Sequence, residues 1–180
     1  MRWSDIETRQ PRLGAVARER LVDPGVLLVV TIRRDGTPRL SPVEPFVLEG
    51  ELWLSMMWGS RKAADLERDP RVLVHSVVTR PEGDEGEVKL RGTVRPEPAM
   101  DVQQRYADAV SSALGWSPEV GRFHLFSVAI EQVTYLRYDH ATGDQYLVLW
   151  PPGTEQVRRG TGATTVGDPE PVGGVLVAER

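Results

Sequence analysis

The chain has 180 residues, of which 40% are hydrophobic, and it carries 22 Lys and Arg against 26 Asp and Glu. Such a length and apolar content suit one globular domain with a sizeable core, and the scattered basic residues argue against a nucleic-acid or anionic-membrane surface. Cysteine is absent from the sequence, which excludes disulfides, thiolate metal sites and a cysteine nucleophile. Residues 1–12 are polar and hold no signal-peptide stretch, so a cytoplasmic location is expected.

The first third of the sequence predicts a helix followed by a three-stranded meander. Apolar residues at helical spacing predict a helix over 5–21, broken or kinked at Pro11. Three strands, separated by turns at an Asp-Gly and a Glu-Gly pair, are expected after it, over 26–32, 37–48 and 51–57. The strand 51–57 is apolar on both faces, so we expect both faces to be covered.

The middle of the chain adds helices and strands that suit a closed barrel. A short helix is expected after Ser60, and a longer one over 99–114. Strands are predicted over 71–78, over 86–95 and, as one or two closing strands, over 123–139. About six strands interrupted by helices suit a mainly β fold, a small closed antiparallel barrel with helices packed outside.

Residues 151–180 differ in composition from the rest of the chain, because Gly, Pro and Thr dominate there and hydrophobic periodicity disappears. We therefore expect a barrel domain over 1–150 and an extended, partly ordered C-terminal arm over 151–180. The glycines of this arm do not have the spacing of a dinucleotide-binding loop, and no strand-to-helix frame surrounds them.

The short helix after Ser60 carries two cations at its N-terminal end. In WGSRKAADLERDPRV, residues 58–72, Arg61 and Lys62 fall in the first turn, where the helix dipole and the unpaired N–H groups favour an anion. A phosphate would be held there by the Ser60 hydroxyl, the first-turn amides and both cations. The alternative is that both side chains point into solvent, at a cost of about half a kcal/mol against the dipole.

The segment GSRKAADLERDPRV, which follows the strand GELWLSMM and the meander segment RRDGTPRLSPV, resembles the cofactor-binding region of a known superfamily. This is the pyridoxamine 5′-phosphate oxidase-like, FMN-binding split β-barrel superfamily, including its flavin/deazaflavin oxidoreductase branch. The resemblance implies a six-stranded antiparallel barrel of Greek-key type and a homodimer with a flavin-type cofactor, FMN or F420, in each of two interface clefts. It also implies which residues hold the cofactor: Ser60, Arg61 and Lys62 hold the phosphate, and Arg39, Ser41, Pro42, Val43, Ser55 and Met56 line the ring and ribityl chain.

The sequence departs from the true oxidases of this superfamily in two places. The strand RLSPVEPF, residues 39–46, lacks their further phosphate-binding Arg and Lys and offers Ser41 and Phe46 instead. The C-terminal arm lacks their Arg- and Trp-rich substrate segment. These departures argue against vitamin B6 oxidation and favour the broader branch, whose members use FMN or the deazaflavin F420 to reduce diverse small molecules.

Few side chains in the sequence are candidates for catalysis. The histidines at 75, 124 and 140 are dispersed and match no metal-ligand spacing, and no Gly-x-Ser-x-Gly elbow is present. If the protein is an enzyme, the cofactor therefore carries the chemistry and passes hydride to or from a small molecule. The leading hypothesis is an FMN-dependent oxidoreductase. The alternatives are an F420-dependent reductase, a non-catalytic flavin- or ligand-binding module, and a barrel that binds no flavin.

Overall fold

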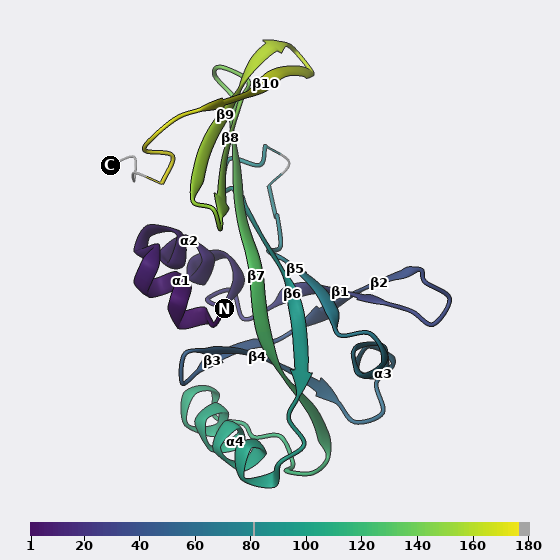
Figure 1. Ribbon diagram of the computed structural model, residues 1–180. Coiled ribbons are helices and arrows are strands. Elements are labelled where there is room, and N and C mark those ends of the chain that lie inside the picture. Colours follow the sequence, from purple (N-terminus) through teal and green to yellow (C-terminus); the bar gives the residue numbers. More distant parts are fainter. Residues whose placement is uncertain (81, 177–180) are drawn as a thin grey trace.

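The computed structural model describes residues 1–80 and 82–176 and shows a barrel from which a long arm projects (Figure 1). Four helices lie in these residues: α1 (Trp3–Arg9), α2 (Pro11–Leu21), α3 (Arg61–Arg68) and α4 (Met100–Leu114). The same residues form ten strands: β1 (Leu27–Ile32), β2 (Pro38–Val43), β3 (Pro45–Leu48), β4 (Glu51–Met57), β5 (Arg71–His75), β6 (Glu87–Pro96), β7 (Phe123–Asp139), β8 (Asp144–Trp150), β9 (Thr154–Gly162) and β10 (Thr165–Pro171).

The barrel is antiparallel, and its strand order is β3-β4-β7-β6-β5-β1-β2. The chain passes from β2 into β3 through Glu44, so the expected strand 37–48 is divided into two. This arrangement confirms the predicted mainly β barrel with flanking helices. The strand number exceeds the predicted six, because one predicted strand is divided, β8 forms just before the predicted arm, and residues 151–180 supply β9 and β10.

Strand β7 belongs to both the barrel and the arm (Figure 1). Its first residues, 123–127, pair with β4, and residues 133–139 pair with β8. Strand β6 pairs with β7 along most of the length of β7, and the register of this pairing shifts once, between Arg91 and Gly92. A Cβ at Gly92 would lie 2.2 Å from the carbonyl oxygen of Ala129, so only glycine fits where the two strands approach at this shift.

Both faces of β4 are covered from Leu52 to Met56, but its last residue, Met57, is 81% exposed, so the predicted cover is incomplete. Leu52, Leu54 and Met56 face the barrel core, where at most 2% of each residue is exposed. Trp53 faces the other way, into a second cluster under α4 that includes Tyr106. Helix α4 therefore covers the outer side of this strand at Trp53.

The N-terminal helix breaks before Pro11, where the sequence predicts a break or kink. Gln10 ends α1 and directly precedes Pro11, the first residue of α2. Trp3 and Leu13 from the two helices are fully buried against the barrel. No helix in the described part of the chain combines the length and apolar character that a bilayer-spanning helix needs.

The C-terminal arm predicted over 151–180 is more ordered than its composition predicts, and the projecting part of the sheet begins earlier, with the far half of β7 and with β8. Strands β8, β9 and β10 extend the sheet in sequence order beyond β7, and Val157 and Val175 join the main core cluster. Only Val157 is buried in β9, so the sequence has no apolar alternation to mark this strand. The arm owes its order to backbone pairing and a few core contacts rather than to an apolar stripe.

Candidate anion site at the start of helix α3

Helix α3 begins at a capped turn that leaves its first amides open to a ligand. The hydroxyl oxygen of Ser60 accepts a hydrogen bond from the Ala63 amide at 3.4 Å, and the first turn contains no acidic residue. Gly59 precedes this cap with a φ of +69°, a conformation that favours glycine. The helix therefore presents a positive end with no acid of its own to neutralise it.

Asp65 ties this helix to the barrel. Its carboxylate accepts hydrogen bonds from Arg39 Nε at 2.6 Å and from Thr31 Oγ1 at 3.0 Å, and it pairs with Arg68 at 3.3 Å. Burial alone would raise the pKa of Asp65, but the hydrogen bonds from Arg39 and Thr31 outweigh it, so the pKa is lowered and the group stays ionised. Because Thr31 lies on β1 and Arg39 on β2, this carboxylate fixes α3 against both strands.

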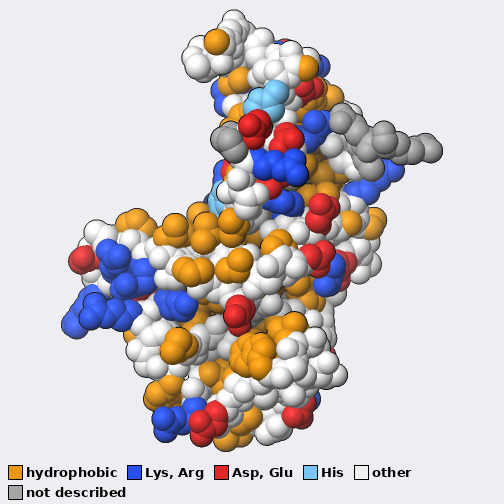
Figure 2. All heavy atoms as spheres, turned by 180° about the vertical axis from the view of Figure 1, so that it is seen from behind, with side chains coloured by type: hydrophobic (Ala, Val, Ile, Leu, Met, Phe, Trp, Pro, Cys, Tyr) orange, Lys and Arg blue, Asp and Glu red, His pale blue; other side chains and the backbone are white. Residues whose placement is uncertain are grey.

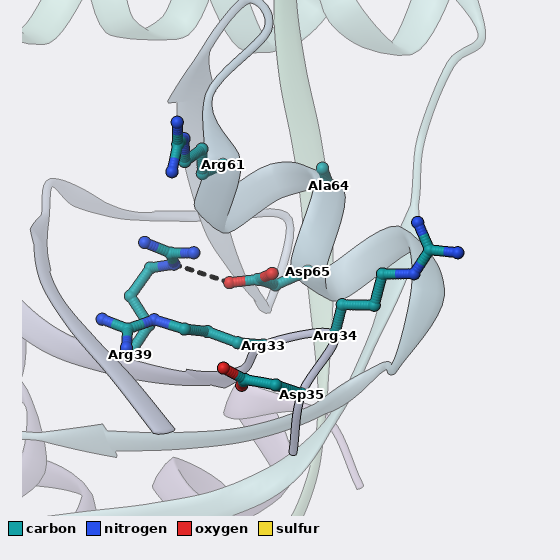
Figure 3. Close-up of a pocket in the computed structure, with 7 residues that line it drawn as sticks. All are labelled: Arg33, Arg34, Asp35, Arg39, Arg61, Ala64 and Asp65. Atoms are coloured by element: carbon teal, nitrogen blue, oxygen red, sulfur yellow. Dashed lines mark hydrogen bonds and ion pairs between the residues drawn. The ribbon is translucent and has the colours of Figure 1, made fainter. Parts of the chain in front are cut away.

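A hollow of about 490 Å³ lies beside this carboxylate, between α3 and the β1–β2 hairpin (Figure 3). The lining residues are Arg33, Arg34, Asp35, Arg39, Arg61, Ala64 and Asp65. Figure 3 shows the guanidinium groups of Arg33, Arg39 and Arg61 on one side of Asp65, whereas that of Arg34 points away. In Figure 2 a group of basic side chains stands out on the same part of the barrel.

The cations of this hollow, which we call the arginine hollow, are only partly neutralised. Asp65 is committed to the network above, and Asp35 accepts hydrogen bonds from Thr37, which lower its pKa. Arg61 is exposed and makes no hydrogen bond or ion pair with any described residue. Only the Nε of Arg39 is engaged by a described residue. The remaining guanidinium donors suit a multiply charged oxyanion such as a phosphate.

The predicted phosphate residues do not all reach the arginine hollow. Arg61 lines it, while Ser60 caps its own helix. Lys62 points to β2, where its ammonium donates to the Pro42 carbonyl at 3.0 Å. Burial lowers the pKa of Lys62, and the neighbouring Glu44 carboxylate opposes that shift.

The residues predicted to line the ring are spread over both sides of the barrel wall. Arg39 lines the arginine hollow, and on the same strand Ser41 is half-buried and Pro42 exposed. Val43 and Met56 are buried in the barrel core, so their side chains are not available to a surface ligand. Ser55 hydrogen-bonds Tyr106 under α4, where burial raises the pKa of Tyr106 to about 12 and the bond to Ser55 opposes the rise.

Arg33 and Arg34 border the hollow without being singled out by the sequence analysis, and only the Arg33 guanidinium lies on the side of Arg39 and Arg61. They follow Ile32, the last residue of β1, and belong to the turn in which the Gly36 amide donates to the Arg33 carbonyl. Two consecutive arginines beside a tight turn can be recognised in the sequence as candidate anion-binding residues, because side chains at a hairpin tip can contact a neighbouring element. Nothing in the sequence says that α3 packs there.

The histidines do not form a metal site. No group of three or more His, Asp or Glu in the described residues is placed to hold a metal ion. His75 lies 3.2 Å from Glu87, and His124 lies 3.0 Å from Glu67. His140 instead contacts the backbone carbonyl of Glu82.

Solved structures share this fold at low sequence identity. General stress protein 26 from Bacillus anthracis str. Sterne is 17% identical, with 69% of this chain and 91% of that chain covered and a TM-score of 0.53. A protein related to general stress protein 26 from Clostridium acetobutylicum is 13% identical over 81% of this chain and 94% of that chain, with a TM-score of 0.55. A NimC/NimA family protein from Clostridium acetobutylicum is 20% identical over 74% and 90%, with a TM-score of 0.53.

A family assignment follows from the sequence comparison rather than from these structures. No curated protein matches the chain in sequence. The family model described as pyridoxamine 5′-phosphate oxidase matches residues 13–137, which contain the whole barrel from β1 to β6, α4 and most of β7. The chain therefore belongs to the pyridoxamine 5′-phosphate oxidase family, with a split-barrel fold and an added C-terminal arm.

Proposed function

We propose that this protein is a homodimeric oxidoreductase that binds FMN, with the cofactor phosphate in the arginine hollow. The observation that carries the proposal is the exposed Arg61 guanidinium, which has no partner among the described residues and lies at the N-terminus of α3 beside Arg39 and Arg33. A folded protein that leaves several cations together with only part of their charge neutralised favours an anionic ligand there. Family membership makes a flavin phosphate the leading candidate.

The chain's own residues would bind and orient the cofactor. Arg61 and Arg33 supply charge, and Asp65 holds Arg39 at 2.6 Å, so that its remaining guanidinium donors keep one direction. Bound FMN supplies hydride chemistry, which needs orientation and electrostatics from the protein more than an acid or a base. This fits a site in which arginines, and no histidine or thiol, line the cavity.

A homodimer is the second part of the proposal, and an apolar outer face of the barrel supports it. On β1, β2 and β5 the cross-strand partners Val30, Leu40 and Leu73 point outward together, and 62% of Leu40 is exposed. Leu28 and Ile32 flank them on β1. An apolar patch of this kind on a sheet is typical of a protein interface. Since β2 also carries Arg39, a second copy on this face would lie close to the arginine hollow.

The phosphate placement is tested by two arginine variants of the same hollow. Arg61→Ala should weaken FMN binding by about tenfold or more, because a charge-assisted hydrogen bond is worth about 1.5–3 kcal/mol. Arg34→Ala is the matched control, since its guanidinium points away from the others, and it should bind within about twofold of the unmodified chain (Figure 3). The measurement is quenching of FMN fluorescence on titration. Equal losses in both variants, or in neither, would remove the phosphate from this position.

The redox part needs a separate measurement. The FMN-loaded protein should be reduced by NAD(P)H and reoxidised by an added acceptor, followed by flavin absorbance. A flavin that binds but never cycles would leave a binding module. Tighter binding of F420 than of FMN would assign the same hollow to a deazaflavin reductase.

A further inference from the structure

The turn that leads into the anion site is held by a histidine on a neighbouring strand. Strand β7 places His124 opposite Met56 of β4, next to the turn from Met57 to Ser60. Within this turn the amide of Ser60 bonds the carbonyl of Met57 at 3.1 Å. The amide of Gly59 donates to Nε2 of His124 at 3.2 Å.

These contacts fix the protonation state of the ring. A backbone amide can only donate, so Nε2 of His124 must be the unprotonated acceptor. The ring proton then lies on Nδ1, which faces the Glu67 carboxylate of α3 at 3.0 Å. A single neutral tautomer therefore joins the turn to the helix that follows it.

The ring is also enclosed by aromatic side chains and acids. The Trp58 ring stacks on it with centroids 4.9 Å apart and planes at 14°, and Phe126 lies parallel at 6.4 Å on the same strand. The charged groups that line the pocket beside the ring are Glu67 from α3, which contacts the ring, and Glu97, which follows β6 and is paired with Arg95 at 2.6 Å. No cation of α3 takes part in this cluster among the described contacts.

We propose that His124 is a positioning residue for the turn from Met57 to Ser60, which we call the cofactor turn. Its neutral imidazole accepts the hydrogen bond of the Gly59 amide. Protonation at Nε2 would break this bond, release the turn and weaken cofactor binding. The proton comes from solvent and changes Nε2 from an acceptor into a donor that faces another donor. The inference rests on the proposed function, since Gly59 is separated only by Ser60 from Arg61 of the arginine hollow.

The first test needs no cofactor. The Gly59 amide signal, followed by NMR over a series of falling pH values, should shift together with the ring signals of His124. In His124→Gln the side-chain oxygen can still accept from Gly59 but cannot titrate, so the amide signal should stay in place. If the Gly59 amide signal of the unmodified chain does not change when His124 is protonated, the proposed clamp, that is, the hydrogen bond from Gly59 to His124, is wrong.

The second test measures FMN affinity over the same series of pH values. Acid should weaken binding to the unmodified chain by about fivefold to tenfold more than binding to His124→Gln, the effect of one lost hydrogen bond at the turn. The comparison between variants removes the titration of the FMN phosphate, which is common to both. His124→Phe keeps the aromatic stack but offers no acceptor, and should bind weakly at every pH.

His140→Gln is the control for the pH dependence, and two further outcomes distinguish failure of the clamp from failure of the proposed function. His140→Gln, at the turn between β7 and β8, should keep the unmodified pH profile, because this residue contacts the Glu82 carbonyl and not the cofactor turn. If no variant binds FMN at any pH, the proposed function fails while the Gly59 signal still decides the clamp. If His124→Phe binds FMN as tightly as the unmodified chain, the positioning role is wrong even though FMN binds.

Discussion

Asp65 organises the arginine hollow at the scale of single residues. Only 4% of it is exposed, and it holds Arg39, Arg68 and Thr31 at once. Removing one member of a buried ion pair leaves the other charge without compensation. The carboxylate therefore stabilises the fold and also directs an arginine of the candidate site.

Replacing Asp65 by Asn should lower the free energy of unfolding by about 2–4 kcal/mol in urea denaturation at neutral pH. The pKa of Asp65 is lower in the folded chain than its ordinary value of about 3.9. Its contribution is thus fully present above about pH 4 and is lost as the pH falls through the folded-state pKa. The difference between the two proteins should shrink in acid.

Asp35→Asn is the control for this substitution. This carboxylate lies in the same hollow, but it is exposed and bonded only to Thr37. Its loss should leave the urea midpoint close to that of the unmodified chain, because an exposed carboxylate is screened by solvent. Similar losses in the two variants would mean that burial of Asp65 matters less than we infer.

At this scale the sequence predicts residue types better than side-chain directions. The N-cap at Ser60 and the cations at Arg61 and Lys62 follow from local rules. Successive helical residues are rotated by about 100°, so one of the two cations lines the hollow and the other reaches Pro42. Which of them does so depends on how α3 packs on β2, and that depends on Asp65.

The pairing of β6 with β7 carries the clearest prediction at the scale of elements. Gly92→Ala should destabilise the protein by about 3 kcal/mol or prevent folding, because the new Cβ would lie 2.2 Å from the Ala129 carbonyl oxygen. The measurement is thermal or urea unfolding of the purified protein.

Gly173→Ala supplies the comparison for the glycine change. A Cβ at Gly173 would meet nothing within 4 Å, so this variant should unfold within about 0.5 kcal/mol of the unmodified chain. Unchanged stability of the Gly92 variant would mean that the two strands separate there at little cost.

The elements that the sequence predicts correctly are those with a local signature. The Pro11 break, the meander turns and the alternation over 86–95 each come from neighbouring residues, and the structure confirms them. The pairing of β9 and β10 has no such signature, since β10 is half-buried or exposed throughout. Long-range backbone pairing creates these strands, and composition alone suggests a loose arm.

The proposed homodimer belongs to the scale of the whole molecule. Leu40→Asp places a charge in the centre of the apolar face and should convert the dimer to a monomer in size-exclusion chromatography with light scattering. FMN affinity should fall with it if the cofactor lies between two copies. Leu114→Asp, at the end of α4, is the control, because 57% of Leu114 is exposed outside that face.

A Leu40 variant that remains dimeric would move the interface elsewhere on the molecule. A variant that becomes monomeric but keeps its FMN affinity would instead place the whole cofactor site within one chain. The two readouts therefore separate assembly from binding.

The continuity of β7 has a mechanical consequence. Its far half carries the arm, and its first residues pair with Met56 and Met57, directly before the turn that His124 holds. The strand is continuous between these two ends, and β6 pairs with it over residues 126–136, so a force on the arm would be carried along β7 to the entrance of α3. A partner that binds the arm would in this way change the affinity of the distant anion site for its ligand.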